Sequence, residues 1–283
     1  MSVHATRHEL AVVRGPSALG GDAGRFLNLT WVLATTEFKL RFFGSALGYF
    51  WQLARPLMLF GVLYAVFTEI VKFGSSGVPH YPLFLLIGVV MFTAFAECTA
   101  GSVQSVVQRE NLVRKIHFPR MVIPLSVVLT ALFNLSLNLV VVFVFVLASG
   151  IGPQLSWLEV PLLLIPLLVF ATGVAMLLSA LYVRYRDIGP IWDVVLQMMF
   201  YATPIFYLPQ AIPANLSKIV MLNPLAVIIE QMRHAIIGDG APSALQSAGS
   251  VPRLILPMVL LVAIFALGLW VFTREAPRVA EEL

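Results

Sequence analysis

The sequence has few charged residues and almost no cysteine. Only 11% of its 283 residues are Asp, Glu, Lys or Arg, whereas 59% are hydrophobic. A soluble domain of this length carries about a quarter charged residues, so the composition excludes a soluble globular protein and indicates a membrane protein. There is one cysteine, Cys98, which lies in an apolar run. A single cysteine excludes a disulfide framework within the chain.

Sequence motifs for catalysis and nucleotide binding are also missing. There is no G-x-x-x-x-G-K-[ST] loop, which excludes that way of binding ATP, and no G-x-S-x-G or C-x-x-C motif. Only His4 and His8 have ligand-like spacing, and they lie in a Gly-rich tail, so we expect no metal site. The cations are scattered between apolar runs, which argues against nucleic-acid binding. A passive pore, or a pore driven by another subunit, remains.

Long apolar runs predict an all-α integral membrane protein with six transmembrane helices. A span needs roughly 20 apolar residues, and such runs cover about 51–71, 81–103, 122–147, 160–181, 191–207 and 254–272. We expect a flexible cytoplasmic tail over 1–25 and a single transmembrane domain over 26–283. The connection 208–252 is too long for a turn and too apolar for a solvated loop. Its short apolar pieces, split by Asn223-Pro224, predict re-entrant or interfacial helices.

Residues 26–50 predict a helix that lies in the membrane interface. Leucine and phenylalanine side chains recur at helical spacing there, and Glu37 and Arg41 are spaced i, i+4. An ordinary solvent-facing helix is the alternative. We expect Lys39 and Arg41 of this helix at the level of the lipid head groups. Arg55 is expected there as well, because it lies at the start of the first span and its side chain must extend to the inner membrane surface.

The segment 108–124, QRENLVRKIHFPRMVIP, carries four cations between two apolar runs. Its Arg and Lys content places it on the cytoplasmic side. Leu112 and Ile116 share one helical face, and Pro119 ends the segment. Across the chain, the alternate connections and both ends hold fourteen cations and the opposite side holds four, so both termini are predicted to be cytoplasmic.

The predicted spans contain polar side chains, among them Glu97, Asn134 and Asn138. Glu97 is an acid in the inner part of the second span, and burying its charge costs about 2.5 to 3.5 kcal/mol, so we expect it to face protein or a water-filled cavity. Asn134 and Asn138 lie one turn apart in the third span. They form either helix–helix hydrogen bonds or a polar stripe that lines a pore.

Five segments, in this order and on this topology, resemble a known family. They are LGYFWQLARPL (47–57), NLVRKIHFPR (111–120), YRDI (185–188), TPIFY (203–207) and NPL (223–225) with Glu230 and Arg233 after it. The chain thereby resembles the membrane subunit of ABC-2 type transporters, specifically exporters of polysaccharides such as O-antigen, teichoic acid or cell-wall galactan. The resemblance covers almost the whole chain after residue 26.

The resemblance implies a non-catalytic permease of the plasma membrane that works as a pair. A second copy would complete the channel, and two copies of a separate ABC ATPase would bind ATP and Mg, so this chain would hold no cofactor. The substrate would be a lipid-linked glycan moved from the cytoplasmic side to the outside. The connection 208–252 would form an outer gate. Residues 109–119 would be a coupling helix, seated in the ATPase through Arg109, Glu110, Leu112, Arg114, Lys115, Ile116 and Phe118.

An exporter of glycans needs surfaces that hold sugars loosely, and aromatic rings at the outer part of the fifth span suit this role. The candidates are Phe200, Tyr201, Phe206 and Tyr207, and positions 200, 203, 204 and 207 are predicted to share one helical face. An interfacial aromatic belt is the alternative.

Two other functions stay open. One is a drug or small-lipid exporter of the same family. The other is a membrane-embedded transferase or phosphatase, for which Arg184, Arg186, Asp187 and Asp193 form the one cluster of charges at an interface.

Overall fold

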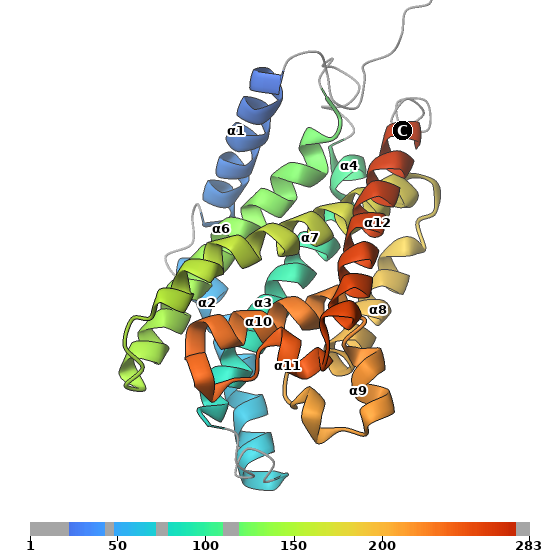
Figure 1. The fold of residues 1–283 in the computed structure, drawn as a ribbon. Helices are drawn as coiled ribbons and strands as arrows, with labels where there is room; N and C mark the ends of the chain where they lie inside the picture. Colours follow the sequence, from blue (N-terminus) through green and yellow to red (C-terminus); the bar gives the residue numbers. More distant parts are fainter. Residues whose placement is uncertain (1–22, 43–47, 72–78, 110–118, 276–283) are drawn as a thin grey trace, which may run out of the picture.

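The computed structural model describes residues 23–42, 48–71, 79–109 and 119–275. These ranges contain helices and no β-strand, which confirms the predicted all-α class (Figure 1). The α-helices are α1 (Ala23–Phe42), α2 (Gly48–Ala65), α3 (Tyr81–Val103), α4 (Ser105–Gln108), α6 (Val122–Ala148), α7 (Glu159–Arg184), α8 (Ile188–Ala202), α9 (Ala214–Val220), α10 (Pro224–Ile237), α11 (Ala244–Ala248) and α12 (Val251–Glu275). A π-helical turn, η1 (Val66–Ile70), continues α2, and the 3-10 turns are η2 (Leu155–Leu158), η3 (Pro209–Ala211) and η4 (Gly238–Gly240).

Within the described ranges, five helical segments are long and apolar enough to cross a membrane. They are Phe50–Ile70, Tyr81–Val103, Val122–Ala148, Leu155–Arg184 and Val251–Glu275. These segments agree with the predicted spans one to four and six. The remaining predicted span corresponds to α8, which is apolar but has only 15 residues. It rises about 22 Å, less than the roughly 30 Å thickness of the hydrocarbon core.

The predicted fifth span extends too far along the sequence. We expected it to end at 207, but α8 ends at Ala202 and Thr203 is extended, with φ −84° and ψ 141°. The reason is Pro204, whose ring disfavours the helical conformation of the residue before it. The prediction that positions 200, 203, 204 and 207 share one helical face is therefore wrong.

The connection 208–252 contains short apolar helices, as predicted, and their sharp bend fits either a broken span or a re-entrant loop. Helices α9 and α10 meet at an angle of 97°. Asn223 caps α10 by accepting a hydrogen bond from the Leu225 amide at 3.0 Å, and Pro224 occupies the first turn, as its sequence signal predicts. The helix ends at Gly238, whose φ of 74° favours glycine.

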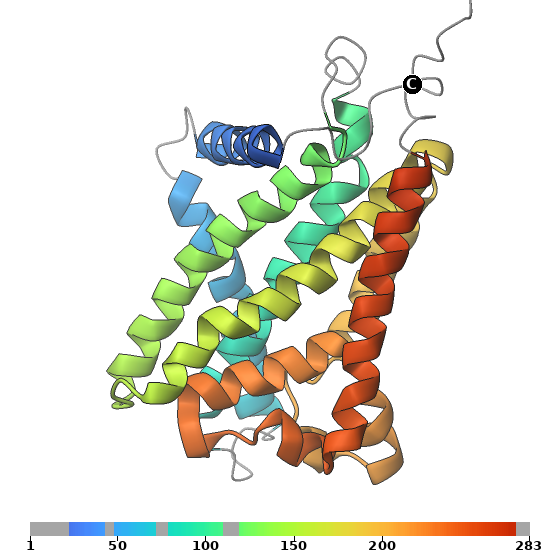
Figure 2. The same ribbon diagram turned by 45° about the horizontal axis from the view of Figure 1, so that its top comes forward.

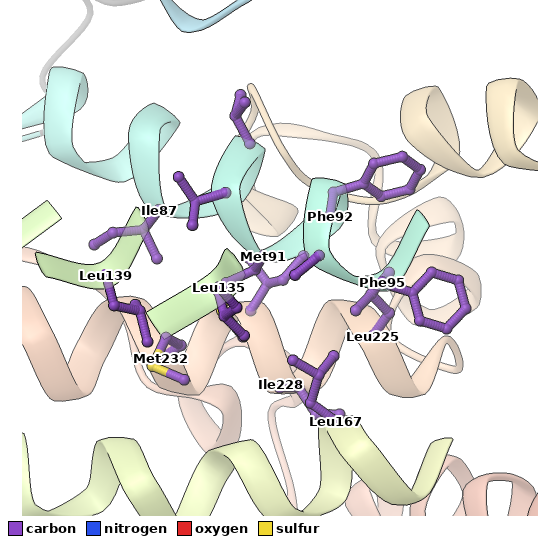
Figure 3. Close-up of a cluster of buried hydrophobic side chains, with 14 of the residues drawn as sticks. Ile87, Met91, Phe92, Phe95, Leu135, Leu139, Leu167, Leu225, Ile228 and Met232 are labelled. Atoms are coloured by element: carbon purple, nitrogen blue, oxygen red, sulfur yellow. The ribbon is translucent and has the colours of Figure 1, made fainter. Parts of the chain in front are cut away.

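Helix α3 lies at the centre of the bundle, and α10 packs into the same core. Figure 3 shows Ile87, Met91 and Phe95 of α3 facing Leu225 and other buried residues of α10, with further side chains from α6 and α7. The apolar 18-residue window of α3 is 78% buried inside the protein. The corresponding window is only 6% buried in the α2–η1 segment and 17% buried in α12. The outer surfaces of α2 and α12 are thus left for lipid or for another subunit.

The described part of the chain has two ends of different character. Helices α1 and α4 and the last turn of α12 lie at one end, and α9 and α11 lie at the other (Figures 1 and 2). We call these the α4 end and the α9 end. Helix α1 lies across the α4 end in Figure 2 and packs on α6, where Trp31 meets the Phe133 ring edge to face at 5.4 Å. This placement suits a helix in the membrane interface.

Candidate functional site

Arg109, the first residue of the predicted coupling helix, joins three elements at the α4 end. Its guanidinium forms an ion pair with Glu37 of α1. It also donates to the Ile123 carbonyl at 3.5 Å and to Ser126 Oγ at 3.4 Å, both on α6. Burial lowers the pKa of Arg109, although a guanidinium stays protonated at neutral pH. A displacement of Arg109 would therefore also act on α1 and α6.

The other six predicted coupling residues, at 110–118, lie outside the described residues, as does most of the predicted tail. Glu37 and Arg41 are spaced i, i+4 on α1, but in the described structure Glu37 forms its ion pair with Arg109 and not with Arg41. Arg41 is exposed and lines a hollow of about 380 Å³ beside Glu37, Gln108 and Arg109. This hollow lies next to the base of the coupling segment.

Glu97 is the centre of a hydrogen-bonded cluster that connects three spans. Its carboxylate accepts from Gln52 Nε2 of α2 at 2.8 Å and from Asn134 Nδ2 of α6 at 3.0 Å. Asn138 Nδ2 donates to the Asn134 carbonyl at 2.9 Å. The cluster supports the expectation that Glu97 faces protein. Both asparagines are buried, at 1% and 8% exposure, which disfavours the pore-lining role within one chain. Asn134 bonds α6 to α3, whereas Asn138 bonds within α6.

Arg233 of α10 is a completely buried cation near the α9 end. It forms an ion pair of 2.7 Å with Glu230, one turn earlier, and neither side chain is exposed. Its other hydrogens go to the carbonyls of Pro204 and Ile205, each at 2.7 Å, and of Phe84 at 3.0 Å. The break after α8 leaves carbonyls without helical partners in an apolar setting, and Arg233 satisfies two of them.

This arrangement links the end of α8 to α3 and α10. The guanidinium carbon lies 3.4 Å from the centroid of the Phe84 ring. A Cβ on Gly88 of α3 would clash with Arg233 Nη2, so only glycine leaves room for the guanidinium. Glu230 also accepts from Ser247 Oγ at 3.2 Å, and Gln210 Nε2 donates to that hydroxyl at 3.0 Å. One buried pair thus organises much of the predicted outer gate.

The four candidate channel aromatics lie together at this end, on two kinds of backbone. Phe200 and Tyr201 occupy the last turn of α8, whereas Phe206 and Tyr207 follow the break at Pro204. Successive ring centroids are 5.5 Å apart for Phe200–Tyr201 and 5.2 Å for Phe206–Tyr207. Phe206 also stacks on Phe67 of η1 at 4.8 Å.

Accessibility differs among these rings. Tyr201 is 66% exposed, while Phe200, Phe206 and Tyr207 are half-buried. The Tyr207 hydroxyl donates back to the Ala202 carbonyl at 3.1 Å. The break therefore folds the second pair of rings back onto the first, and Tyr201 presents the largest free aromatic face of the four.

The remaining candidate positions lie on the surface. Lys39, Arg41 and Arg55 are exposed, on α1 and α2. Arg184, Arg186, Asp187 and Asp193 are exposed as well. The two arginines lie over tyrosine rings of their own segment, at 5.4 and 5.2 Å, and no ion pair joins the four residues in the described structure. This geometry offers no enclosed acid–base site.

The sequence did not predict the main partners in these clusters. They include Glu37 for Arg109, Gln52 and Asn134 for Glu97, and the α8 break for Arg233. Glu230 and Arg233 did carry a signal, because an acid and a cation spaced i, i+3 inside an apolar segment indicate a buried pair. The choice of Gln52 and Glu37 depends on how distant helices pack.

Comparison with known proteins agrees with this architecture. Residues 28–237 match the family model described as ABC-2 type transporter. An O-antigen export system permease protein RfbA of Klebsiella pneumoniae is 33% identical over 213 residues, which cover 75% of this chain and 81% of that protein. A protein of the same name from Myxococcus xanthus is 28% identical over 214 residues, covering 75% and 81%. The polysialic acid transport protein KpsM of Escherichia coli is 22% identical over 206 residues, covering 71% and 78%. The chain belongs to the ABC-2 type transporter family.

Proposed function

We propose that this chain is the membrane-spanning permease subunit of an ATP-driven exporter that moves a lipid-linked polysaccharide from the cytoplasmic side to the outside. The observation that carries the proposal is the family match over 28–237 together with relatives named for O-antigen export and polysialic acid transport. These names favour a polysaccharide over a drug or small lipid, and the exposed charges at 184–193 give no support to an enzyme.

The working unit in this proposal contains two copies of this chain and two copies of a separate ABC ATPase. The sequence has no phosphate loop of its own, so ATP and Mg bind to the partner. The weakly buried outer surface of α2 is available for contact with the second copy or with lipid. Exposed Lys39, Arg41 and Arg55 lie where lipid head groups are expected.

Energy from ATP enters through residues 109–119. Arg109 connects this segment to α1 and α6, and α4 connects it to α3. Helix α3 is about 34 Å long at 1.5 Å per residue and is mostly buried, so it is suited to move as a rigid rod. At its far end Phe84 contacts Arg233, which also holds the α8 break and the aromatic cluster. A push at the α4 end thus has a continuous packed route to the α9 end.

The orientation in this proposal puts the α4 end in the cytoplasm. In a variant without Cys98, single cysteines are introduced at 112 and 245 and exposed to an impermeant thiol reagent. Position 245 should react from outside the cell and position 112 only after the membrane is opened. The reverse pattern would show that the orientation is wrong.

The function is tested by replacing Leu112 and Ile116 with Asp. Leu112 and Ile116 are apolar and spaced i, i+4, which predicts one shared helical face, and charges there should weaken docking of the ATPase. The matched control is Leu216→Asp with Ile219→Asp, because both residues are exposed on α9 at the opposite end. We expect the first double variant to lose ATPase co-purification and glycan export, and the control to keep ATPase co-purification. Normal assembly and export in the first double variant would refute the coupling role.

A further inference from the structure

A pocket at the α9 end lies between α9, α11 and the start of α12. It has a volume of about 400 Å³ and is lined by, among others, Ser217, Lys218, Met221, Leu222, Arg253 and Leu256. Its walls therefore combine apolar side chains with two cations. Neither cation belongs to the coupling segment, the Arg233 cluster or the aromatic cluster described above.

Both cations are available to an anion. Lys218 and Arg253 are exposed, and within the described ranges neither forms an ion pair with a carboxylate. Arg253 donates one hydrogen bond, from Nη1 to the Ala248 carbonyl at 3.1 Å, which holds the side chain beside α11. An ammonium and a guanidinium have eight hydrogens in total to donate, so most of their capacity is free.

A second hollow, an apolar groove of about 600 Å³, adjoins the pocket along α12. It extends from Val251 to Ala266 and is lined only by apolar side chains. Pro252 and Leu256 line the pocket, while Ile255 and Val259, three residues further along, line the groove. Residues at i and i+3 are neighbours on a helix surface, so the pocket and the groove border each other on α12.

The pocket and the groove together match an amphiphilic ligand in size and chemistry. The groove covers 15 residue steps on α12, or about 22 Å, which exceeds half of the roughly 30 Å hydrocarbon thickness. Its lining offers no hydrogen bond to a sugar, which argues against a path for glycan. Cations near a membrane surface attract anionic lipids.

We propose that these hollows bind one anionic glycerophospholipid, with its phosphate at Lys218 and Arg253 and an acyl chain in the groove on α12. The lipid contacts α9, α11 and α12 at once and so braces the re-entrant gate against the last span. The binding site does not depend on export; only its assignment to the outer leaflet rests on the proposed orientation.

The test measures lipid retention by the purified full-length protein. The protein is delipidated in detergent, titrated with phosphatidylglycerol or phosphatidylcholine, and examined by native mass spectrometry. Wild type should retain phosphatidylglycerol about fivefold or more over phosphatidylcholine. Lys218→Gln and Arg253→Gln should each lower that retention about fivefold. The control, Arg274→Gln, removes an exposed cation from the far end of α12 and should leave the retained lipid at this site unchanged.

Two further variants keep the proposal open to refutation. Arg253 contacts α11, so its loss can affect folding, but Lys218→Gln removes no hydrogen bond or ion pair within the described structure. Ala266→Phe fills the groove without changing charge and should also lower retention. Equal retention of the two phospholipids, or wild-type retention by Lys218→Gln, would overturn the proposal. Native mass spectra of protein purified without delipidation, showing an isoprenoid phosphate in place of a glycerophospholipid, would overturn it as well.

Discussion

Replacing the buried Arg233 with Met should destabilise the outer half of the protein more than substitution of any exposed residue. Methionine is unbranched and apolar but shorter; it leaves the Glu230 carboxylate buried without its cation and removes the donors that reach Phe84, Pro204 and Ile205. Removing one partner of a buried ion pair costs about 3 to 5 kcal/mol. Since about 1 kcal/mol moves the midpoint by roughly 2 to 4 °C in a protein of this size class, we expect Tm to fall by roughly 10 °C.

The assay is thermal unfolding of the purified protein in detergent, with Arg274→Met as the matched control. Arg274 is exposed and lies over the Trp270 ring at 5.3 Å, so its loss should change stability by no more than about 0.5 kcal/mol. Arg233→Lys should recover only part of the loss, because a single ammonium cannot reach the four acceptors that the planar guanidinium reaches.

Gly88→Ala tests whether the loss of stability comes from the contact between the Arg233 guanidinium and α3. A Cβ there would clash with the guanidinium and lie 3.0 Å from the Ile205 carbonyl oxygen. We expect about 1 to 3 kcal/mol of destabilisation when Arg233 is present and much less when it is Met. Additive effects of the two substitutions, or a Tm of Arg233→Met within about 2 °C of wild type, would refute the reasoning.

Two other predictions concern the path of the glycan and the packing of α7 against α12. Replacing Tyr201 and Tyr207 with Ala should slow glycan export while expression and ATPase assembly stay intact, and unchanged export rates would favour the interfacial belt. Gly268→Ala should lower Tm because a Cβ there would clash with the Gly173 carbonyl where α7 and α12 touch. Gly61→Ala on α2 is its control, since a Cβ there meets nothing within 4 Å. Equal Tm values for the two alanine variants would contradict the close approach of α7 and α12.

Hydrophobic length was enough to predict most of the spans. Apolar runs of 20 or more residues with at most one charge have few alternatives to a transmembrane helix, so α3 and α6 begin where the sequence predicts. Local signals also worked where chain stereochemistry decides, as at Asn223-Pro224 and Gly238. The end of α8 was misjudged because hydropathy outweighed the effect of Pro204 on Thr203.

Contacts between distant helices could not be predicted from one sequence. Glu97 was expected to face protein, but nothing local indicates that Gln52, 45 positions earlier, supplies its partner. Arg233 is one of the four cations that the charge count assigns to the side opposite the termini, yet it is fully buried, because its acceptors are created by a break 28 and 29 residues away. Charge counting treats every cation as solvated, and only the packed structure shows which cations are exposed.

The most direct test of the proposed function is ATP-dependent movement of glycan in inverted membrane vesicles that contain this chain and its ATPase partner. Lipid-linked polysaccharide on the outer face of such vesicles corresponds to the cytoplasmic pool. We predict that ATP makes the glycan resistant to an added glycosidase, and that the double replacement of Leu112 and Ile116 by Asp abolishes this protection. Protection without ATP, or a glycan that stays fully digestible with ATP and both subunits present, would contradict the account.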